Sequence, residues 1–473
     1  YGSTRDHVLE LTAFLSDGSE VIFKALNPEE FEAKLKGNNL ENKIYQHLYK
    51  SLQPEAVQEE IREQFPKPGI HRRNTGYAID LLLDMQPFGG DQPFDLCKLV
   101  CGSEGTLAFV TEIKLHIDVL PPPGSVLVCA HFDSIDASMK ATLLAMNLHP
   151  FACELMDKVI LDCTIGNIEQ EKNRFFIKGN PRAVLMVEFR AEKFSEAEAK
   201  ASVFIRQLKE KKLGYAFPTL SGSEINRAWD LRKAGLGLLA NIPGDAKSVA
   251  CIEDTAVEVQ DLPAYIREFS QLMEGFKQEA IYYAHAGAGE LHLRPVLNLK
   301  EEADIRLFRQ ISEASARLVK KYQGSLSGEH GDGRVRGEFL PLMIGDKNYD
   351  LLKQIKDCWD PRHIFNPNKI VDTPPMDQSL RYQKGGEAVN EHTMLDFSSA
   401  GGLLRMAEKC NGSGDCRKLP IAGGTMCPSY QATRDEKDTT RARANALREF
   451  LKQENNGNAF VHPELKAVMD LCL

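Results

Sequence analysis

Two short glycine-bearing stretches constrain this chain of 473 residues more than any other feature. The first runs from His285 to His292 as His-Ala-Gly-Ala-Gly-Glu-Leu-His, and the second runs from Ser327 to Gly333 as Ser-Gly-Glu-His-Gly-Asp-Gly. Glycine adds no side chain to a core and loses more conformational freedom on folding than other residues, so neither stretch is expected in a packed interior. We expect both at strand ends that open into tight turns.

The residue types in these stretches predict a metal site with a proton acceptor beside it. Two histidines and one glutamate are a common ligand set for a divalent metal that keeps a coordination position open. A further histidine that binds no metal could move a proton near neutral pH. Residues seven apart in a strand point to opposite faces, so His285 and His292 can share a ligand only if residues 286–289 bend the chain. The alternative is a hairpin turn between two structural histidines; two such stretches in one chain favour the site.

Length and composition describe an ordinary globular protein. A chain of 473 residues is too long for one core, which predicts two or three domains. Hydrophobic residues make up 42% and charged residues 26%. The net charge of −9 argues against a nucleic-acid partner, because phosphate binding depends on clustered cations. No apolar run reaches the roughly 18 residues of a membrane span, so none is expected, although a peripheral membrane contact stays open.

The pattern of strands and helices predicts an α+β fold. Residues 7–23 alternate as a hairpin, residues 28–64 have a helical period broken at Pro54, and residues 108–117 alternate as a strand. The run Pro121–Gly124 marks a candidate domain boundary.

Beyond that boundary, strand-like runs alternate with amphipathic helices, which predicts an antiparallel sheet covered by helices on one face. Residues 372–400 are typical of a linker, and a compact helical region with a basic helix at 434–452 follows. Strands are expected at 126–132, 183–189, 250–259 and 280–284, and helices at 134–147, 194–212, 261–276 and 299–322.

An ordered set of motifs joins the two stretches, and together they resemble a known family. The chain is similar to the FAD-linked oxidases of the vanillyl-alcohol-oxidase (PCMH-type) group. Within that group it resembles the D-2-hydroxy acid dehydrogenases, above all the large bacterial D-2-hydroxyglutarate dehydrogenases that fuse a flavin module to a ferredoxin-like one. The resemblance covers nearly the whole chain, and its further motifs are Asn74–Tyr77, Cys101–Leu107, Ile252–Val257 and Asn366–Ile370.

The resemblance implies three domains. Residues 1–120 would be the C-terminal portion of a PCMH-type FAD-binding domain, and residues 121–375 the substrate and metal domain, built as an antiparallel sheet with helices. Residues 376–473 would hold the linker and a truncated, mostly helical, ferredoxin-like region. We expect both chain ends to be cut from a longer polypeptide, and we expect this chain to bind flavin poorly.

The resemblance also implies roles for individual residues. His285, His292 and Glu329 would bind a zinc-like divalent metal, and His330 would act as the catalytic base. FAD contacts would come from Asn74 and from the loop before a strand, at Gly102, Ser103, Gly105, Thr106 and Leu107.

Three cations are the candidates for binding the substrate. Arg232 matches an arginine that family members use on the substrate carboxylate. Arg294 stands where the family often has asparagine, and its planar fork suits a carboxylate. Lys247 is a weaker candidate. For either arginine, a surface salt bridge is the alternative interpretation.

Four cysteines near the C-terminus predict an iron–sulfur cluster in the full-length protein. A ferredoxin run reads C-x2-C-x2-C-x3-C-P. Here Ser413 occupies the middle position, so the run is incomplete and this chain is not expected to assemble the [4Fe–4S] cluster. A zinc site and free thiols are the alternatives. The cysteines are Cys410, Cys416, Cys427 and Cys472.

The expected function is FAD-dependent oxidation of a D-2-hydroxy acid, with D-2-hydroxyglutarate oxidised to 2-oxoglutarate. Electrons would pass through the iron–sulfur cluster to an unknown acceptor, a quinone or an electron-transfer protein. The alternatives are a D-lactate or glycolate dehydrogenase, and a non-catalytic iron–sulfur electron-transfer subunit. We expect a cytoplasmic protein of bacterial type; a peripheral contact with the inner membrane and a homo-oligomer stay open.

Overall fold

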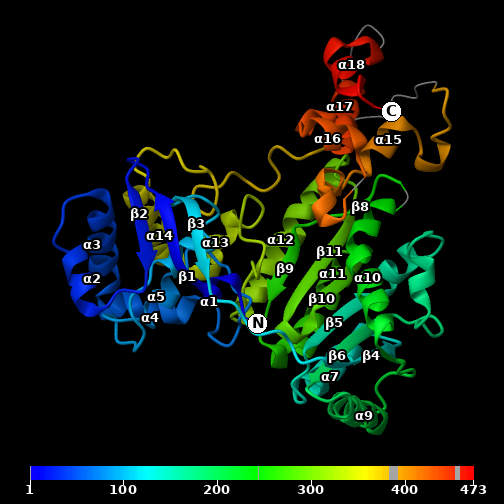
Figure 1. The fold of residues 1–473 in the computed structure, drawn as a ribbon, viewed down its shortest axis with the longest axis horizontal. Helices are drawn as coiled ribbons and strands as arrows, with labels where there is room; N and C mark the ends of the chain where they lie inside the picture. The colour runs from blue at the N-terminus through cyan, green and yellow to red at the C-terminus, as the bar shows by residue number, and fades with distance from the viewer. Residues whose placement is uncertain (1, 243, 383–392, 425, 453–458, 473) are drawn as a thin grey trace.

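The computed structural model arranges helices around two antiparallel sheets, which confirms the α+β class expected from the sequence (Figure 1). Part of the predicted linker, at 383–392, lies outside the described residues. Within the described part of the chain, no helix is both long and apolar enough to cross a membrane. The structure describes residues 2–242, 244–382, 393–424, 426–452 and 459–472.

The smaller sheet has three strands in the order β2-β1-β3. β1 and β2 form the predicted hairpin, in which Leu11 and Phe23 pair and are buried. The predicted helical stretch divides into α2, α3 and α4, and Pro54 is the residue before α4. The bounds are β1 Val8–Phe14, β2 Glu20–Lys24, β3 Phe109–Leu115, α2 Pro28–Lys34, α3 Leu40–Leu52 and α4 Glu55–Gln64, with short helices α1 Thr4–His7, α5 Ile79–Leu82 and α6 Cys97–Val100.

Strand β3 is an exposed edge of the smaller sheet. None of its residues is buried, although it carries Phe109, Ile113 and Leu115. The exposed apolar character continues after the strand at Ile117 and Val119. An apolar edge strand presents unpaired backbone groups to which a further strand can add.

The chain returns to the smaller sheet after completing the larger one. Helices α13 (Leu340–Ile344) and α14 (Asp346–Trp359) lie beside this sheet, and α14 packs against α3 (Figure 1). The ring of Trp359 is 5.5 Å from that of Phe23, and its backbone carbonyl accepts a hydrogen bond from Ser16 Oγ at 2.7 Å. The first and last parts of residues 1–371 therefore share one core.

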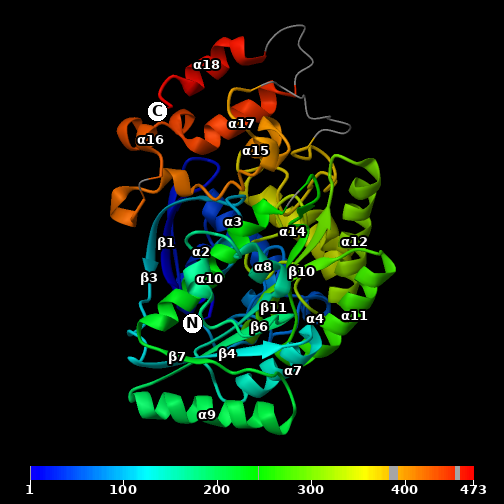
Figure 2. The same cartoon turned by 90° about the vertical axis from the view of Figure 1, so that its right-hand side faces the viewer.

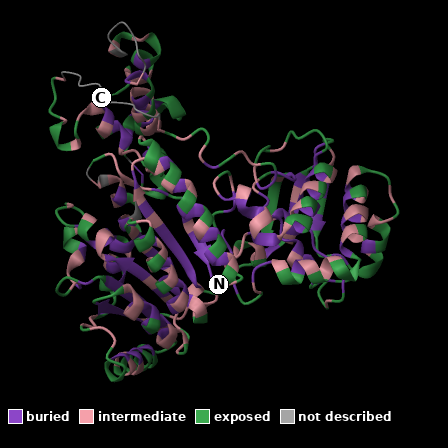
Figure 3. Ribbon diagram, turned by 180° about the vertical axis from the view of Figure 1, so that it is seen from behind, coloured by how far each residue is buried: buried purple, intermediate pink, exposed green. Residues whose placement is uncertain are grey.

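The larger sheet has eight antiparallel strands, ordered β7-β4-β6-β5-β10-β11-β8, with β9 also paired to β11. Figure 3 shows its central strands as the most continuously buried part of the molecule. The strands are β4 Gly124–Phe132, β5 Ala152–Asp157, β6 Ala183–Ala191, β7 Thr219–Ser221, β8 Lys247–Ser248, β9 Ile252–Ala256, β10 Ala280–His285 and β11 Glu290–Leu297.

Helices cover both faces of this sheet, so the expectation of one covered face was wrong. Val126 and Val128 of β4 belong to one core cluster, whereas Leu127 and Cys129 belong to another. A strand buried on both faces has a continuous apolar run instead of alternation, as β4 and β6 do. The first cluster packs on α7 Ile135–Met146, α9 Phe194–Glu210, α11 Leu262–Gly275 and α12 Glu302–Lys321, and the second on α8 Lys158–Cys163 and α10 Ser223–Leu238.

The C-terminal region is helical, as expected, and lies at one end of the larger sheet (Figures 1 and 2). Ion pairs dock it there. Asp245 accepts hydrogen bonds from Lys300 at 3.0 Å and from Arg405 at 2.7 Å, and Lys300 also bonds Glu408 at 2.8 Å. The helices are α15 Leu403–Glu408, α16 Pro428–Thr433, α17 Thr440–Phe450 and α18 Pro463–Met469.

Candidate metal and substrate site

The hairpin of β10 and β11 brings His285 and His292 to one face of the larger sheet. β10 ends at His285, residues 286–288 form a short 3₁₀ turn, and Gly289 has a φ of 72°. β11 then runs back along β10, so that His292 lies opposite Tyr283. His285 comes two residues after Tyr283 and therefore shares its face. The structure thus contains the bend that the sequence requires, and residues seven apart in sequence meet.

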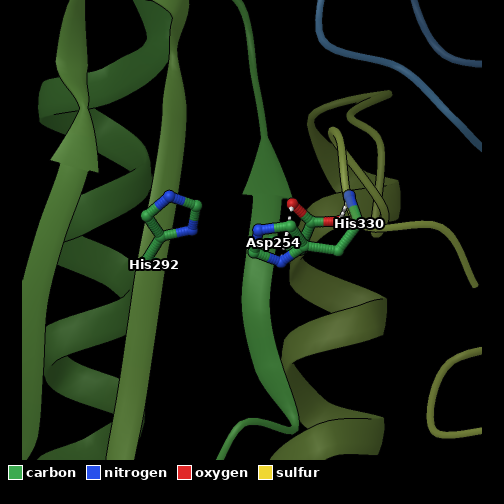
Figure 4. A group of neighbouring side chains, drawn as sticks. All are labelled: Asp254, His292 and His330. Atoms are coloured by element: carbon green, nitrogen blue, oxygen red, sulfur yellow. Dashed lines mark hydrogen bonds and ion pairs between the residues drawn. The ribbon is translucent and has the colours of Figure 1, made fainter. Parts of the chain in front are cut away.

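The loop that carries Glu329 and His330 is anchored on β9 by Asp254 (Figure 4). The Asp254 side chain is buried, and its carboxylate accepts hydrogen bonds from the backbone N–H groups of Glu329 at 3.1 Å and His330 at 2.9 Å. Ser327 Oγ donates to the same carboxylate at 3.2 Å. Hydrogen bonds to an ionised acceptor are roughly twice as strong as neutral ones. Strand β9 therefore fixes the backbone positions from which the Glu329 and His330 side chains extend.

The three predicted metal ligands converge. One atom each of His285, His292 and Glu329 lies within 4.8 Å of the others. Oε1 of Glu329 is 3.4 Å from His285 Nε2 and 3.9 Å from His292 Nε2. The two imidazole rings are nearly perpendicular, with centroids 5.1 Å apart. The other oxygen of Glu329 accepts a hydrogen bond from Arg72.

Both imidazoles have their second nitrogen already engaged. His285 Nδ1 lies 2.9 Å from Oε2 of Glu154, and His292 Nδ1 lies 2.6 Å from the backbone carbonyl oxygen of Glu253. When Nδ1–H is donated to these oxygens, Nε2 is the nitrogen left to bind a metal, and in both rings it is the atom that faces Glu329. Proteins hold histidine metal ligands in this way. The donor set and its supports therefore fit a divalent cation.

The electrostatics of the three residues differ. Burial lowers the pKa of His292 to about 4, so its ring is neutral. The hydrogen bond from His285 lowers the pKa of Glu329 to about 2, so this carboxylate is ionised. Burial alone would lower the pKa of His285, but hydrogen bonds to Glu154 and Glu329 raise it to about 9. Without a metal this ring therefore carries a proton on both nitrogens, and a bound metal would displace the proton on Nε2.

His330 stacks on His292, with ring centroids 5.2 Å apart and planes within 7° (Figure 4). Its Nδ1 is 3.5 Å from a carboxylate oxygen of Glu253 and 3.5 Å from one of Asp254, and its Nε2 is 3.6 Å from Glu329 Oε1. The hydrogen bond with Glu253 raises the pKa of His330. The ring is partly exposed, so a small molecule can reach it.

A second group could also hold a cation, formed by Asp254, His292 and His330. The oxygens of Asp254 are already bonded to two backbone N–H groups and to a hydroxyl. The Glu329 oxygen that faces the histidines instead has imidazole nitrogens as its neighbours. The group containing Glu329 is therefore the better candidate.

Two of the three predicted substrate cations lie beside this group. Arg232 forms a salt bridge with Glu154, and its guanidinium lies 4.2 Å from the ring centroid of Tyr283. Arg294, on β11 two residues after His292, forms a salt bridge with Glu253. In each arginine the Nε atom is buried without a hydrogen-bond partner.

Lys247 lies elsewhere. It pairs with Leu297 at the far end of β11, and its Nζ donates to the carbonyl oxygen of Ile242. Burial lowers the pKa of Lys247. Its charged neighbours include Lys409 of the C-terminal region and Asp245, which pairs with Arg405 of that region. The structure does not bring Lys247 to the histidine pair in the way that it brings the two arginines.

The predicted flavin loop, 101–107, contacts the second glycine-bearing stretch. Glu104 has a φ of 55°, and its carboxylate accepts a hydrogen bond from Gly333 N–H at 3.0 Å. The backbone N–H of Asn74 donates to the carbonyl oxygen of Ser327 at 2.7 Å. Gly102, Ser103, Gly105, Thr106 and Leu107 thus lie in a loop that is joined to the metal-site loop.

The four predicted iron–sulfur cysteines differ in exposure. Cys416 and Cys427 are buried, Cys410 is half-buried and Cys472 is exposed. Burial raises the pKa of the Cys427 thiol, but hydrogen bonds, among them one from Arg443, outweigh burial and leave that pKa low.

Four residues that support the site had no role predicted from the sequence: Arg72, Glu154, Glu253 and Asp254. Glu253 and Asp254 were part of a motif, but only as signs of a resemblance. The sequence did contain a sign of their role: two acidic residues within an apolar, strand-like run must have polar or charged partners when the strand is buried. Glu154 gave the same signal within β5.

A family model described as "FAD linked oxidases, C-terminal domain" matches residues 121–370. The chain belongs to this family. Among relatives of this FAD linked oxidase, D-2-hydroxyglutarate dehydrogenase of Pseudomonas putida is 32% identical over 476 residues, covering 97% of this chain and 45% of that protein. D-lactate dehydrogenase [cytochrome] 1 of Saccharomyces cerevisiae is 28% identical over 297 residues, covering 61% and 49%.

The chain therefore spans about half the length of these relatives. A solved structure, p-cresol methylhydroxylase with substrate bound, aligns over 76% of the chain and 65% of its own, with 9% identity and a TM-score of 0.45.

Proposed function

We propose that this protein takes part in the FAD-dependent oxidation of a D-2-hydroxy acid, with D-2-hydroxyglutarate as the substrate and 2-oxoglutarate as the product. One observation carries the proposal. Two arginines with buried, unpartnered Nε atoms, Arg232 and Arg294, flank a His-His-Glu group with a partly exposed histidine beside it. Arginine binds carboxylates through paired N–H groups, and a five-carbon hydroxy diacid has two carboxylates.

His285, His292 and Glu329 would hold the divalent metal, whose chemistry when bound is Lewis-acid polarisation of the substrate hydroxyl. His330 would accept the hydroxyl proton at Nε2, while Glu253 and Asp254 face its Nδ1 and stabilise the charge that it gains. Arg232 and Arg294 would orient the carboxylates and hold C2 in one position. The chemistry that FAD supplies when bound is acceptance of the hydride from C2.

We propose that residues 1–120 are the C-terminal portion of an FAD-binding domain and that its remaining part adds to β3. The exposed apolar edge at Phe109, Ile113 and Leu115 supports this assignment, because such an edge is covered in a finished domain. Asn74 and the loop Gly102–Leu107 would contact the cofactor. Residues 121–375 would be the substrate and metal domain.

Residues 376–473 would belong to an iron–sulfur region that passes electrons from the reduced flavin to a quinone or an electron-transfer protein. Cys410, Cys416, Cys427 and Cys472 are its proposed ligands. We propose a cytoplasmic location, with peripheral contact at the inner membrane and homo-oligomer formation as matters for experiment.

The test uses the full-length, flavin-loaded protein under anaerobic conditions. The flavin absorbance is followed while D-2-hydroxyglutarate, L-2-hydroxyglutarate, D-lactate and glycolate are added in turn. Bleaching by the D-diacid alone supports the reaction, its stereochemistry and its substrate. Bleaching by D-lactate or glycolate keeps the mechanism and replaces the substrate, as the yeast relative's name would suggest. A stable flavin band with all four compounds would refute the dehydrogenase and favour a non-catalytic electron-transfer subunit.

A further inference from the structure

We propose that Glu154 is a positioning residue that sets both the metal ligand His285 and the substrate cation Arg232. The inference rests on the proposed function, because it concerns the metal group and the arginine named there. Glu154 touches no reacting atom in that scheme. It would act through its two partners.

The geometry places one carboxylate between the two groups. Both oxygens of Glu154 lie near His285 Nδ1, at 2.9 and 3.1 Å, and Oε2 also pairs with the Arg232 guanidinium. Glu154 is on β5, the strand next to β10, so its backbone is fixed by the sheet that carries His285. Its side chain is 16% exposed. A largely buried carboxylate needs such partners, and here they are the two groups that the site uses.

The contact with His285 fixes the tautomer of its ring. A carboxylate that accepts the Nδ1–H keeps that proton on Nδ1, so Nε2, the nitrogen facing Glu329, is the one left to bind a metal. Loss of such an outer partner typically weakens metal binding about 10- to 100-fold. Without Glu154, the His285 ring could rotate or take the other tautomer, and the three ligand atoms would no longer converge.

The contact with Arg232 sets the direction of the guanidinium. Its Nη2 pairs with Glu154 and also donates to the carbonyl oxygen of Ala284 at 3.2 Å, while the Tyr283 ring lies 4.2 Å away. Nε is left without a partner. Glu154 also lines an open groove of about 500 Å³ together with Arg232, so a small anion can reach this pair.

The same groove offers a matched control. Glu188 is a buried carboxylate on the neighbouring strand β6, and it accepts hydrogen bonds from Arg190 at 2.6 Å and Trp229 at 2.9 Å. Among the described residues its hydrogen bonds go to Ser125, Arg190 and Trp229, and not to His285 or Arg232. A change at Glu188 therefore removes a buried carboxylate and an arginine partner without touching the metal group.

The experiment titrates metal-free protein with Zn²⁺ against a chromophoric chelator. It uses the unchanged chain, Glu154→Ala, Glu154→Gln, Glu188→Gln and His285→Ala. We expect His285→Ala to abolish tight binding and Glu154→Ala to weaken it about 10- to 100-fold. Glu154→Gln should weaken binding less, because the amide oxygen still accepts from Nδ1–H, and Glu188→Gln should leave it unchanged. The visible bands of bound Co²⁺ should shift in Glu154→Ala alone among the Glu variants.

The outcomes separate the two hypotheses. If His285→Ala loses Zn²⁺ and Glu154→Ala binds as tightly as the unchanged chain, the positioning role is overturned and the metal site stands. If Glu188→Gln weakens binding as much as the Glu154 variants, the effect is general destabilisation and the positioning role is again overturned. If His285→Ala binds Zn²⁺ normally, the metal site of the proposed function itself fails.

Discussion

Asp254 accepts a hydrogen bond from the backbone N–H of His330 at 2.9 Å, although the two residues are 76 positions apart. Strand β9 thus positions the candidate base from outside its own loop. The same carboxylate accepts a hydrogen bond from the N–H of Glu329, so one buried side chain positions both the proposed metal ligand Glu329 and the proposed base His330.

Replacing Asp254 by alanine should destabilise the whole domain that contains the larger sheet. The change leaves two backbone N–H groups without their acceptor and removes the charge facing Arg336. Breaking a buried charged network costs about 3–5 kcal/mol, which urea denaturation would measure as a lower free energy of unfolding. Glu313→Ala, at an exposed helix pair with Arg317, should change this quantity by less than about 0.5 kcal/mol. Equal effects of the two variants would contradict the anchoring role.

The turn between His285 and His292, the proposed metal ligands, should tolerate a side chain at Gly287 and not at Gly289. Gly289 has a positive φ, and a Cβ there would lie 2.0 Å from the Val257 carbonyl oxygen. Gly289→Ala should therefore distort the hairpin and lower Zn²⁺ retained after dialysis. At Gly287 a Cβ would meet only side-chain atoms closely, those of Cys153 and Met146 at 3.0 and 3.1 Å, so Gly287→Ala is the milder matched variant. If Gly289→Ala retained more Zn²⁺ than Gly287→Ala, the conclusion that the turn requires glycine at position 289 would be wrong.

Arg294 should contribute more to a diacid than to a monoacid. Hydrogen bonds to charged groups are worth about 1.5–3 kcal/mol, so Arg294→Met should raise KM for D-2-hydroxyglutarate about 10- to 150-fold. The KM for D-lactate should change much less, because Arg232 remains for a single carboxylate. Arg190→Met, a change in an arginine that pairs with Glu188 away from the metal group, is the control. Steady-state kinetics with both substrates gives the answer, and equal KM increases for the two acids would exclude Arg294 as the second carboxylate contact.

The docking of the C-terminal region should depend on pH. Hydrogen bonds from Arg405 and Lys300 hold the pKa of Asp245 well below its ordinary value. A depressed folded-state pKa stabilises the docked form above the ordinary pKa near 3.8, and that stabilisation disappears as the pH falls through the lower, folded-state value. Limited acid proteolysis should therefore release the C-terminal helices more readily as the pH falls below about 4. Asp245→Asn should be cleaved readily at pH 5, where the unchanged chain resists.

Much of the fold was predictable because its elements have strong periodicity. The helices expected at 134–147, 194–212, 261–276 and 299–322 match α7, α9, α11 and α12 closely. The helices on the opposite face of the sheet were not expected, because β4 and β6 lack the alternation from which one can assign two faces. Leu127 and Val128 look alike in sequence, and only their neighbours in space separate them.

The candidate site likewise has residues that could be predicted from the sequence and residues that could not. Its ligands carry distinctive residue types at short spacing, so His285, His292 and Glu329 could be selected from the sequence alone. The supports could not, because Glu154 and Asp254 are ordinary acidic residues until a strand register brings them to a histidine. Lys247 illustrates the opposite case. A lysine is a suitable residue type for binding a carboxylate, but this one pairs with Leu297, at the end of β11 far from the histidines.

Ligands drawn from a hairpin and from a later loop also impose an order on assembly. The two histidines can meet once β10 and β11 have paired, but Glu329 follows the 20-residue helix α12 and arrives only after that helix has been synthesised and packed. A cation bound by all three proposed ligands would therefore require that α12 and the loop after it have already packed on the larger sheet. Retained zinc would then report that this domain has finished folding during biosynthesis.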